Sequence, residues 1–293
     1  MGDTASANKA YFNKLAAEYD SKYEKTVLQL EREIRKRKEF IGVEWVDDED
    51  DDSDGDDGTG KGESHGSGKA AAEAASAADT KPVRLLDYAC GTGLISRALA
   101  QFTTHCVGID ISENMVAAYN ARAENQGLSA DEMRAYQGDL TAPSDPDPAA
   151  FSGAEFRDFD VAGVGLGFHH FDDPELSAKR LVERLRPGGV LIILDFLPHE
   201  KLGSDLPAAN TVKHHGFSEE RIRAIFEQAG AGKDFALEDL GSGVVFGGHG
   251  HGHDHSHSHE PGHHHDHHDH SHGAQKDGKG MKRRVFLARG TKA

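Results

Sequence analysis

The sequence has few of the residues that hold a secreted domain together or carry a chain across a membrane. Its 293 residues include two cysteines and one tryptophan, and no apolar run approaches the roughly 18 residues of a membrane span. Two cysteines cannot build a disulfide scaffold, so we expect a reducing compartment and a cytoplasmic protein, with the nucleus as the alternative. The first residues contain no basic segment followed by an apolar one, so we expect no signal peptide.

Positive charge is also scarce. Lys and Arg total 33 against 50 Asp and Glu, which gives a formal net charge of −17. A nucleic-acid-binding surface needs clustered Lys and Arg to meet phosphates, so we expect no nucleic-acid partner.

Much of the negative charge lies in one short segment. Nine of the eleven residues in Asp47–Asp57 are acidic, and a Gly-, Ser- and Ala-rich stretch follows to about Thr80. Such a composition is typical of a solvated, disordered insert. The alternating acids in Asp50–Gly55 match the first half of an EF-hand loop, but Lys61 occupies the position where that loop needs Glu. We therefore expect an acidic linker and no calcium sensor.

The histidines are concentrated in a second segment. Thirteen of the 20 His lie in His249–His272, mixed with Gly, Asp and Ser. Imidazole binds zinc, nickel and copper, but a repetitive tract offers many equivalent partial sites and no fixed ligand set. We expect weak metal adsorption here, with a selected metal role as the alternative, and no metal site in the fold. The adsorbing residues would include His249, His251, His253, His255, His257, His259, His263, His264 and His265.

Outside these two segments, the pattern alternates between strands and helices. Apolar spacing predicts helices over Ala7–Phe40, Leu94–Phe102, Ser112–Gly127, Pro174–Leu185 and Ser218–Ala229. Apolar runs predict strands over Val83–Asp87, His105–Asp110, Met133–Gln137, Phe159–Gly165 and Val190–Phe196, after a turn at Pro187–Gly189. Two further strands, Phe235–Phe246 and Arg284–Arg289, have no helix between them and should pair as a hairpin whose loop is the His tract.

This order predicts an α/β fold with a mostly parallel sheet and helices on both faces. We expect a helical N-terminal cap (1–46), an acidic insert (47–82), a core (83–246), a His-rich insert in the last hairpin (247–282) and a final strand (283–293). Ligands of such sheets bind at the carboxyl ends of the strands.

The stretch Leu85–Leu99, LLDYACGTGLISRAL, contains the most informative motif. A buried strand carries the acid Asp87, a turn contains Gly91 and Gly93, and a helix follows. A dinucleotide fingerprint requires Gly or Ala three positions after Gly93, and that position is Ser96. The motif therefore disfavours an NAD-dependent enzyme, and the position of Asp87 favours a ligand with an ammonium group.

Five motifs in this order resemble those of class I S-adenosylmethionine (SAM)-dependent methyltransferases, in the small-molecule, ubiquinone-biosynthesis-like group. They are LLDYACGTG, GIDIS, QGDL, FDVAGVGLGFHHFDDP and LRPGGVLIILDF, and the opening YFNKLAAEYDSKY resembles the family's N-terminal helix. The resemblance implies a Rossmann-like, seven-stranded, mostly parallel sheet with a C-terminal antiparallel hairpin. It also implies SAM as cofactor and a small-molecule acceptor.

The resemblance also implies roles for individual residues. The turn at Ala89–Gly93 and Asp87 would meet the methionine part of SAM, and Asp110 would bind the ribose hydroxyls. The adenine would contact Ile111, Met115, Asp139 and Leu140. The sulfonium would lie beside Gly165 and Leu166, and Tyr11 and Tyr19 would cover the cofactor. The implied cofactor set is Tyr11, Tyr19, Asp87, Ala89, Cys90, Gly91, Thr92, Gly93, Asp110, Ile111, Met115, Asp139, Leu140, Gly165 and Leu166.

Catalytic residues are harder to infer, because methyl transfer needs alignment more than acid–base chemistry. The candidate general bases are the histidines near predicted strand ends, His169, His170, His199, His214 and His215. Of these we expect His169, His170 or His214 to act, and a packing or loop-structure role is the alternative for the pairs His169–His170 and His214–His215. Leu197–Phe217 is the expected acceptor lid. Three other functions stay open: a catalytically silent SAM-binding protein, a metal-binding scaffold and a protein methyltransferase.

Overall fold

The computed structural model describes residues 4–46, 81–201, 210–241, 244–246 and 281–293. The two inserts expected at 47–82 and 247–282 lie almost entirely outside these residues. The same holds for the His tract and for the acidic run.

Six α-helices occur in the described residues, together with four short 3-10 turns. They are α1 (Thr4–Arg35), α2 (Lys38–Ile41), α4 (Leu94–Leu99), α5 (Glu113–Asn125), α6 (Pro174–Arg184) and α7 (Glu219–Ala229). The expected capping residues Ser112 and Ser218 each accept a hydrogen bond from a backbone N–H of the first turn of α5 and α7.

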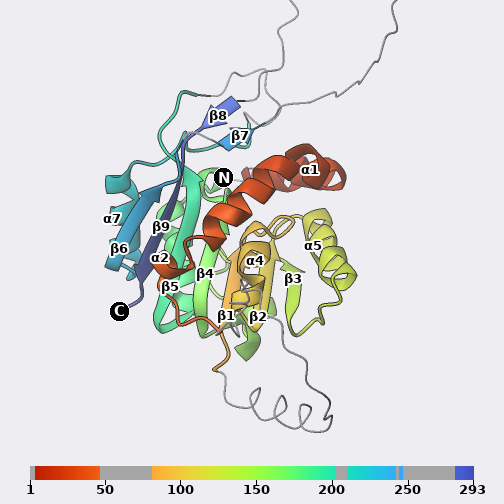
Figure 1. The fold of residues 1–293 in the computed structure, drawn as a ribbon, viewed down its shortest axis with the longest axis horizontal. Coiled ribbons are helices and arrows are strands. Elements are labelled where there is room, and N and C mark those ends of the chain that lie inside the picture. The colour runs from red at the N-terminus through yellow and green to blue at the C-terminus, as the bar shows by residue number, and fades with distance from the viewer. Residues whose placement is uncertain (1–3, 47–80, 202–209, 242–243, 247–280) are drawn as a thin grey trace, which may run out of the picture.

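The strands form one seven-stranded sheet and a separate two-stranded ribbon (Figure 1). They are β1 (Arg84–Tyr88), β2 (His105–Asp110), β3 (Met133–Gln137), β4 (Phe159–Gly165), β5 (Leu185–Phe196), β6 (Lys233–Asp239), β7 (Val244–Phe246), β8 (Met281–Arg283) and β9 (Val285–Thr291). The large sheet has the order β3-β2-β1-β4-β5-β9-β6; β1 to β5 run parallel, and β9 is antiparallel to β5 and β6. The predicted fold class is confirmed.

The last strands differ from the expectation in one detail. The segment predicted as a single strand, Phe235–Phe246, is divided into β6 and β7, and Gly241 between them has a φ of +81°. As a result β6 pairs with β9 inside the large sheet, while β7 pairs with β8 in the ribbon. The turn expected at Pro187–Gly189 also lies within β5, where the register against β4 shifts.

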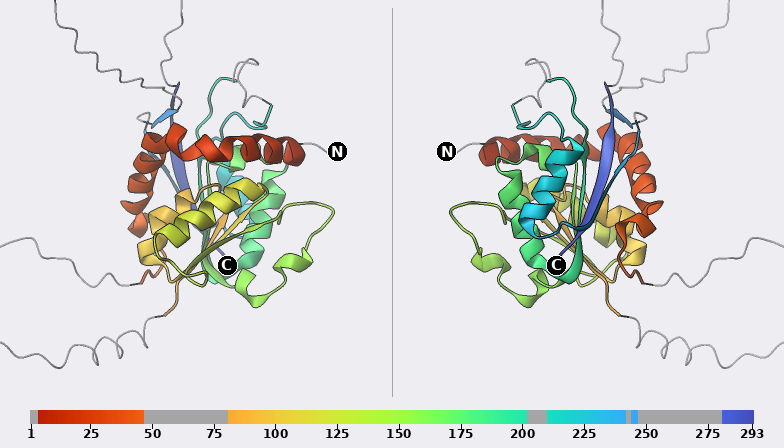
Figure 2. Two further views of the ribbon diagram at one scale, coloured as in Figure 1. Left: turned by 90° about the vertical axis from the view of Figure 1, so that its right-hand side faces the viewer. Right: turned by 90° about the vertical axis from the view of Figure 1, so that its left-hand side faces the viewer.

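Each face of the sheet packs against its own group of helices, as the two side views show (Figure 2). Leu86 and Ile193 contribute to the core beneath α6 and α7, and their neighbours Leu85 and Ile192 to the core beneath α1, α2, α4 and α5. Successive strand residues point to opposite faces, so each strand supplies both cores.

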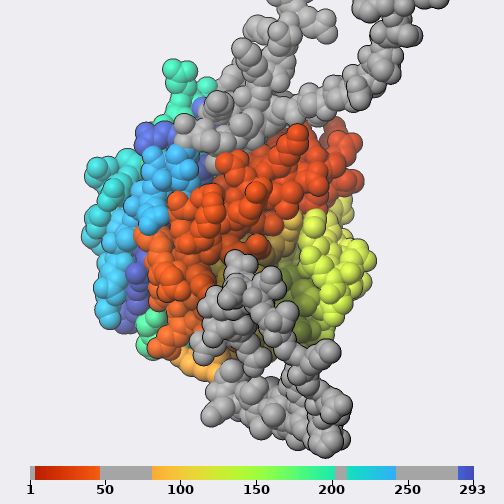
Figure 3. Space-filling view, viewed as in Figure 1, coloured from red at the N-terminus to blue at the C-terminus, as the bar shows by residue number. Residues whose placement is uncertain are grey.

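The chain changes direction between β1 and β4. From β1 it proceeds outward through β2 to β3, and then returns to the other side of β1 as β4. This reversal is the topological switch point, where the loops after neighbouring strands diverge and leave room for a ligand. In space-filling view, α1 covers much of the middle of one face of the molecule (Figure 3).

Candidate functional site

A cavity of about 1160 Å³ opens where the loops after β1, β2, β3 and β4 face α1. Two non-glycine residues of its wall, Ala89 after β1 and Leu166 after β4, have positive φ angles of 52° and 56°. Left-handed backbone is unfavourable for residues with a Cβ atom and is found at functional sites, where the surrounding structure holds it in place. The cavity thus lies at the switch point, and strained backbone borders it after both β1 and β4.

Asp110 is the buried acid of this cavity, with 8% of its surface exposed. One carboxylate oxygen accepts a hydrogen bond of 2.8 Å from the Gly91 N–H, and the other accepts one of 2.8 Å from the Ser112 N–H. Burial raises the pKa of Asp110, and these two N–H donors oppose the rise. Each oxygen keeps a second lone pair for a ligand.

Asp87 lies behind the wall of the cavity and outside its lining. Its Oδ2 atom accepts hydrogen bonds from the backbone N–H of Ser96, at 3.0 Å, and from the Ser96 hydroxyl, at 2.8 Å. Burial raises the pKa of Asp87 to about 7. Ser96, which argues against a dinucleotide fingerprint, is therefore the residue of α4 that holds this acid of β1 in position. A direct contact between Asp87 and a ligand stays a prediction.

Asp139 follows β3 and lines the cavity next to Tyr88. Its Oδ1 atom accepts hydrogen bonds from the Tyr88 hydroxyl at 2.8 Å, and from the backbone N–H and hydroxyl of Thr141 at 2.7 and 2.8 Å. Burial and the charge of Asp139 raise the pKa of Tyr88, so its phenol stays protonated and donates. These three hydrogen bonds are thus all accepted by the same carboxylate oxygen, Oδ1.

Helix α1 forms another wall of the cavity, with three tyrosines, Tyr11, Tyr19 and Tyr23. The rings of Tyr19 and Tyr23 lie 5.0 Å apart, and burial raises the pKa of the Tyr19 phenol. The residue after Tyr19, Asp20, accepts a 2.7 Å hydrogen bond from the Thr92 hydroxyl and forms an ion pair with Arg122. The helix is thereby attached to the glycine turn.

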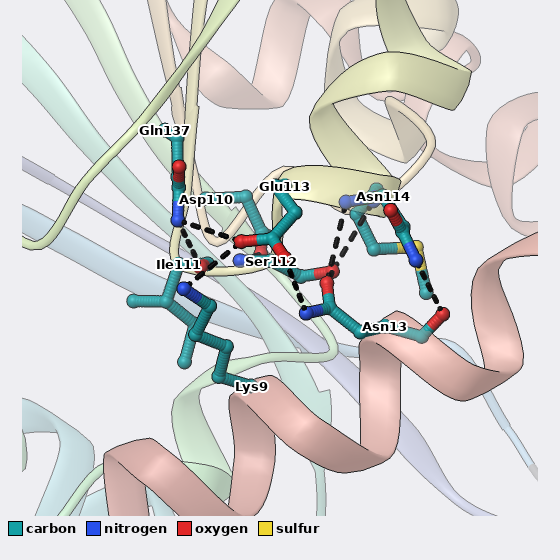
Figure 4. A network of polar contacts seen from close by, with 9 residues as sticks. Lys9, Asn13, Asp110, Ile111, Ser112, Glu113, Asn114 and Gln137 are labelled. Carbon is teal, nitrogen blue, oxygen red and sulfur yellow. Dashed lines mark hydrogen bonds and ion pairs between the residues drawn. The ribbon is translucent and has the colours of Figure 1, made fainter.

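A second attachment joins α1 to the start of α5, directly beside Asp110 (Figure 4). The Asn13 Oδ1 atom accepts a 2.6 Å hydrogen bond from the Ser112 hydroxyl and a 3.2 Å bond from the Asn114 N–H. The Asn13 amide donates to Glu113 at 3.2 Å, and Lys9 forms a 2.9 Å ion pair with the same carboxylate. Asn13 of α1, which covers the cavity, is thus hydrogen-bonded to Ser112, the second residue after Asp110.

The histidines differ sharply in their surroundings. His169 lies with its Nδ1 atom 2.9 Å from Oδ1 of the buried Asp195. The ring of His170 lies against it at a tilt of 38°, with ring centroids 4.1 Å apart, and burial lowers the pKa of His170 to about 3. His214 lies outside the cavity lining, where its Nε2 atom is 3.1 Å from the backbone carbonyl of Phe171.

Most of the residues named from the sequence therefore meet in one cavity. Its lining includes Tyr11, Tyr19, Ala89, Cys90, Gly91, Thr92, Asp110, Ile111, Met115, Asp139, Gly165, Leu166, His169 and His170. Four others lie outside the lining: Asp87, Gly93, Leu140 and His214.

The sequence reasoning missed Tyr23, Tyr88 and Asp195. Only Asp195 carried a usable signal, because it is a lone acid within the apolar run VLIILDF, and a charge in a buried strand needs a partner.

In the part of the chain that the structure describes, no cluster of three or more His, Cys, Asp or Glu could hold a metal ion. Within the same residues, no helix is both long and apolar enough to cross a membrane.

Comparisons with known proteins show what this chain is similar to. A family model described as a methyltransferase domain matches residues 63–232. An uncharacterized methyltransferase of Schizosaccharomyces pombe is 32% identical over 151 residues, which cover 50% of this chain and 52% of that protein. A demethylmenaquinone methyltransferase of Thermus thermophilus is 34% identical over 127 residues, which cover 43% and 52%. The chain thus spans about half the length of the curated relatives it matches. Among solved structures, the YcgJ protein of Bacillus subtilis aligns with 72% of this chain and 92% of its own, with 16% identity and a TM-score of 0.45.

Proposed function

Because this chain belongs to the methyltransferase-domain family, we propose that it transfers a methyl group from S-adenosylmethionine to a small-molecule acceptor. The observation that carries the proposal is Asp110. It is a buried carboxylate at the end of β2, beside the glycine turn, and each of its oxygens has one backbone donor and one remaining lone pair. A vicinal diol such as a ribose supplies two hydroxyl donors for these two acceptors.

The residues around Asp110 fit the other parts of the cofactor. Ile111 and Met115 offer an apolar surface for adenine, and the carboxylate of Asp139 would accept a hydrogen bond from its amino group. The Ala89–Gly93 turn and the pair Gly165 and Leu166 would face the methionine part and the sulfonium. When bound, SAM supplies a methyl group already activated by a positive sulfur, so the protein's part is to align the acceptor and exclude water.

The size and the cover of the cavity support a small acceptor. At about 1160 Å³, the cavity exceeds the usual volume of a site for one drug-sized ligand, so it has room for a cofactor and a second molecule. Helix α1 closes one side through Asn13 and Asp20, which favours a molecule that can be enclosed over a side chain of a folded protein. One of the relatives is named for demethylmenaquinone, which is a small molecule.

The compartment and the histidine tract belong to the same proposal. Cys90 and Cys106 are both free and buried, which supports a reducing, cytoplasmic location. For His249–His272 we retain weak adsorption of divalent metals, without a role in methyl transfer.

The Asp110→Ala variant tests the cofactor site. Loss of a charged hydrogen-bond pair should weaken SAM binding at least about tenfold, measured by isothermal titration calorimetry. Asp131→Ala, at an exposed position, is the matched control and should bind like the unmodified chain. Equal affinity of the Asp110 variant would contradict the site assignment. An unmodified protein that binds no SAM and transfers no labelled methyl group to a metabolite extract would contradict the function.

A further inference from the structure

Asp195 is a fully buried carboxylate near the carboxyl end of the apolar strand β5. It accepts hydrogen bonds from the backbone N–H groups of Phe196, at 2.7 Å, and of His169, at 3.0 Å. Its two oxygens also lie 2.9 and 3.1 Å from the Nδ1 atom of His169. A charge at this depth requires donors, and the imidazole is the only side-chain donor recorded for it among the described residues.

This contact determines which nitrogen of His169 carries the proton. A carboxylate is purely an acceptor, so Nδ1 is the protonated nitrogen and Nε2 carries the lone pair. The structure records no hydrogen bond for Nε2 within the described residues, and His169 lines the cavity. A basic nitrogen backed by a carboxylate is therefore available to a molecule in the cavity.

The neighbouring histidines lack this arrangement. His170 also lines the cavity, but its Nδ1 atom is 2.7 Å from the backbone carbonyl of Thr211, and burial lowers its pKa to about 3. A base so weak cannot hold a proton taken from an acceptor. His199 has a backbone carbonyl as its hydrogen-bond partner, and burial lowers its pKa too. Among the described residues, no carboxylate is hydrogen-bonded to either ring.

Aromatic side chains surround this part of the cavity. Phe12 of α1 contacts His170 edge-on, with ring centroids 5.3 Å apart, and Phe196 lies 5.0 Å from the ring of His169. Phe171, which also lines the cavity, packs 5.7 Å from Tyr88. Rings at these separations form walls against which a planar aromatic molecule can pack in an offset or edge-on manner.

From these observations we propose that His169 is the general base that deprotonates an aryl hydroxyl of the acceptor, and that Asp195 positions it. The proposal rests on the methyl transfer proposed above and names its acceptor class. A phenol has a pKa near 10, so at neutral pH its oxygen is a poor nucleophile until a base removes the proton. A neutral amine acceptor would need no such base.

The reaction balances without a further reagent. The acceptor oxygen forms a bond to the methyl carbon while the bond between that carbon and sulfur breaks, and the electron pair leaves with sulfur. The hydroxyl proton passes to Nε2 of His169. Asp195 stabilises the resulting imidazolium, which later releases the proton to water. The products are an aryl methyl ether, the demethylated cofactor and a proton.

Two phenols that differ in acidity test the role of His169. Catechol keeps its proton at neutral pH, whereas 4-nitrocatechol loses it much more readily. His169→Asn keeps an N–H donor for Asp195 but has no nitrogen in place of Nε2. We expect kcat to fall at least about 100-fold on catechol and less than about tenfold on 4-nitrocatechol, with SAM affinity within about threefold of the unmodified protein.

Asp195→Asn tests the positioning residue. It preserves size and can still accept a hydrogen bond, but it removes the charge that stabilises the imidazolium. We expect kcat on catechol to fall at least about 30-fold with KM nearly unchanged, and a much smaller loss on 4-nitrocatechol. A merely structural role would reduce both rates alike. Asp131→Asn, an exposed acid outside the cavity lining, serves as the control.

Three results would overturn the proposal. The first is an equal loss on both phenols in the His169 variant. The second is an unmodified protein that binds SAM and methylates aniline but neither phenol. The third is an unmodified protein that binds SAM and transfers methyl groups from it to a metabolite extract but to neither phenol. In the last two results SAM binding and methyl transfer persist, which separates failure of this proposal from failure of the proposed function.

Discussion

At the scale of single residues, the site depends on buried polar groups that each have an assigned partner. The Tyr119 hydroxyl donates to the Ser96 hydroxyl at 2.8 Å, which in turn donates to Asp87. On the other side of the cavity, Asp195 holds His169. A buried group without its partner costs more than the hydrogen bond itself contributes, so substitutions in these chains should act on stability as well as on binding.

The two glycines of the β1–α4 turn should respond differently to alanine. Gly93 has a φ of +96°, and a Cβ there would lie 3.0 Å from the ring of the buried Tyr119, whereas Gly91 has a φ of +52° and open space around it. We expect Gly93→Ala to lower the free energy of unfolding by about 3 kcal/mol, from strain and overpacking together. Gly91→Ala should cost about 1 kcal/mol, from strain alone. Urea denaturation measures both, and equal losses would contradict the steric explanation.

His170 should make the protein less stable in acid. Burial holds its pKa at about 3 instead of the usual 6.5, with the ring of His169 opposing protonation and Asp195 favouring it. The folded state keeps His170 neutral while the unfolded state takes up a proton below pH 6.5, so stability is lost as the pH falls from 6.5 towards 3. In His170→Phe, urea midpoints should depend less on pH over this window. His105→Phe is the control, and an unaltered slope in the His170 variant would argue against this origin.

At the scale of elements, α1 is the helix that completes the site. Its contacts reach three loops: Asn8 donates to the backbone carbonyl of His170 at 3.3 Å, Asn13 binds the start of α5, and Asp20 binds the glycine turn. These contacts are partly buried single hydrogen bonds, and each contributes only modestly to stability by itself. A ligand enclosed beneath α1 should enter and leave when they open together.

Asn13→Ala should therefore loosen the cover of the cavity. The substitution removes the hydrogen bonds to Ser112, Glu113 and the Asn114 N–H. We expect SAM to dissociate about tenfold faster, equivalent to about 1.4 kcal/mol, and the amides of α1 to exchange faster. Stopped-flow fluorescence and hydrogen exchange would measure these effects. Lys14→Ala, on an exposed position of the same helix, should change neither, and an unchanged dissociation rate for the Asn13 variant would exclude α1 as the gate.

At the scale of the whole molecule, the last strand, β9, brings the chain's end into the large sheet, next to the edge strand β6. Strand β9 lies between β5 and β6, so residues near the C-terminus contribute directly to both cores. The long histidine segment joins β7 to β8, which form a ribbon separate from the large sheet. Length added at this place extends a hairpin loop without changing any pairing of the seven-stranded sheet.

Removal of residues 247–280 should leave the cofactor site intact. Phe246 and Met281 are paired opposite each other in the ribbon, so an Asn-Gly turn can join them directly. We expect SAM affinity and methyl transfer to stay within about twofold of the unmodified chain, while retention on immobilised nickel is lost. Calorimetry and a nickel column provide the two measurements. Lost transfer would make the tract part of the site, and retained nickel binding would locate the metal ligands elsewhere.

Local patterns were enough to predict the elements of the core. The bounds expected for β2, β3 and β4 agree with the structure to the residue, and the caps at Ser112 and Ser218 were both found. Strand alternation, caps and glycine turns act over a few neighbouring residues, so the sequence displays them directly. The division of the predicted strand Phe235–Phe246 at Gly241 was not predicted. Its two halves pair with different strands, β9 and β8, and strand pairing is not visible in the local sequence.

The sequence by itself therefore determined the order of strands and helices, the glycine turn after β1 and the acids at the strand ends. It could not determine which of these residues share a cavity, because that depends on sheet order and on where α1 packs. Only the tertiary structure assigned Asp87 to Ser96, placed Asn13 against Ser112 and brought Asp195 to His169, which precedes it by 26 residues. The physical reason is distance along the chain. A sequence pattern reflects interactions between residues a few positions apart, whereas the partner of a buried charge is the group that the fold brings next to it.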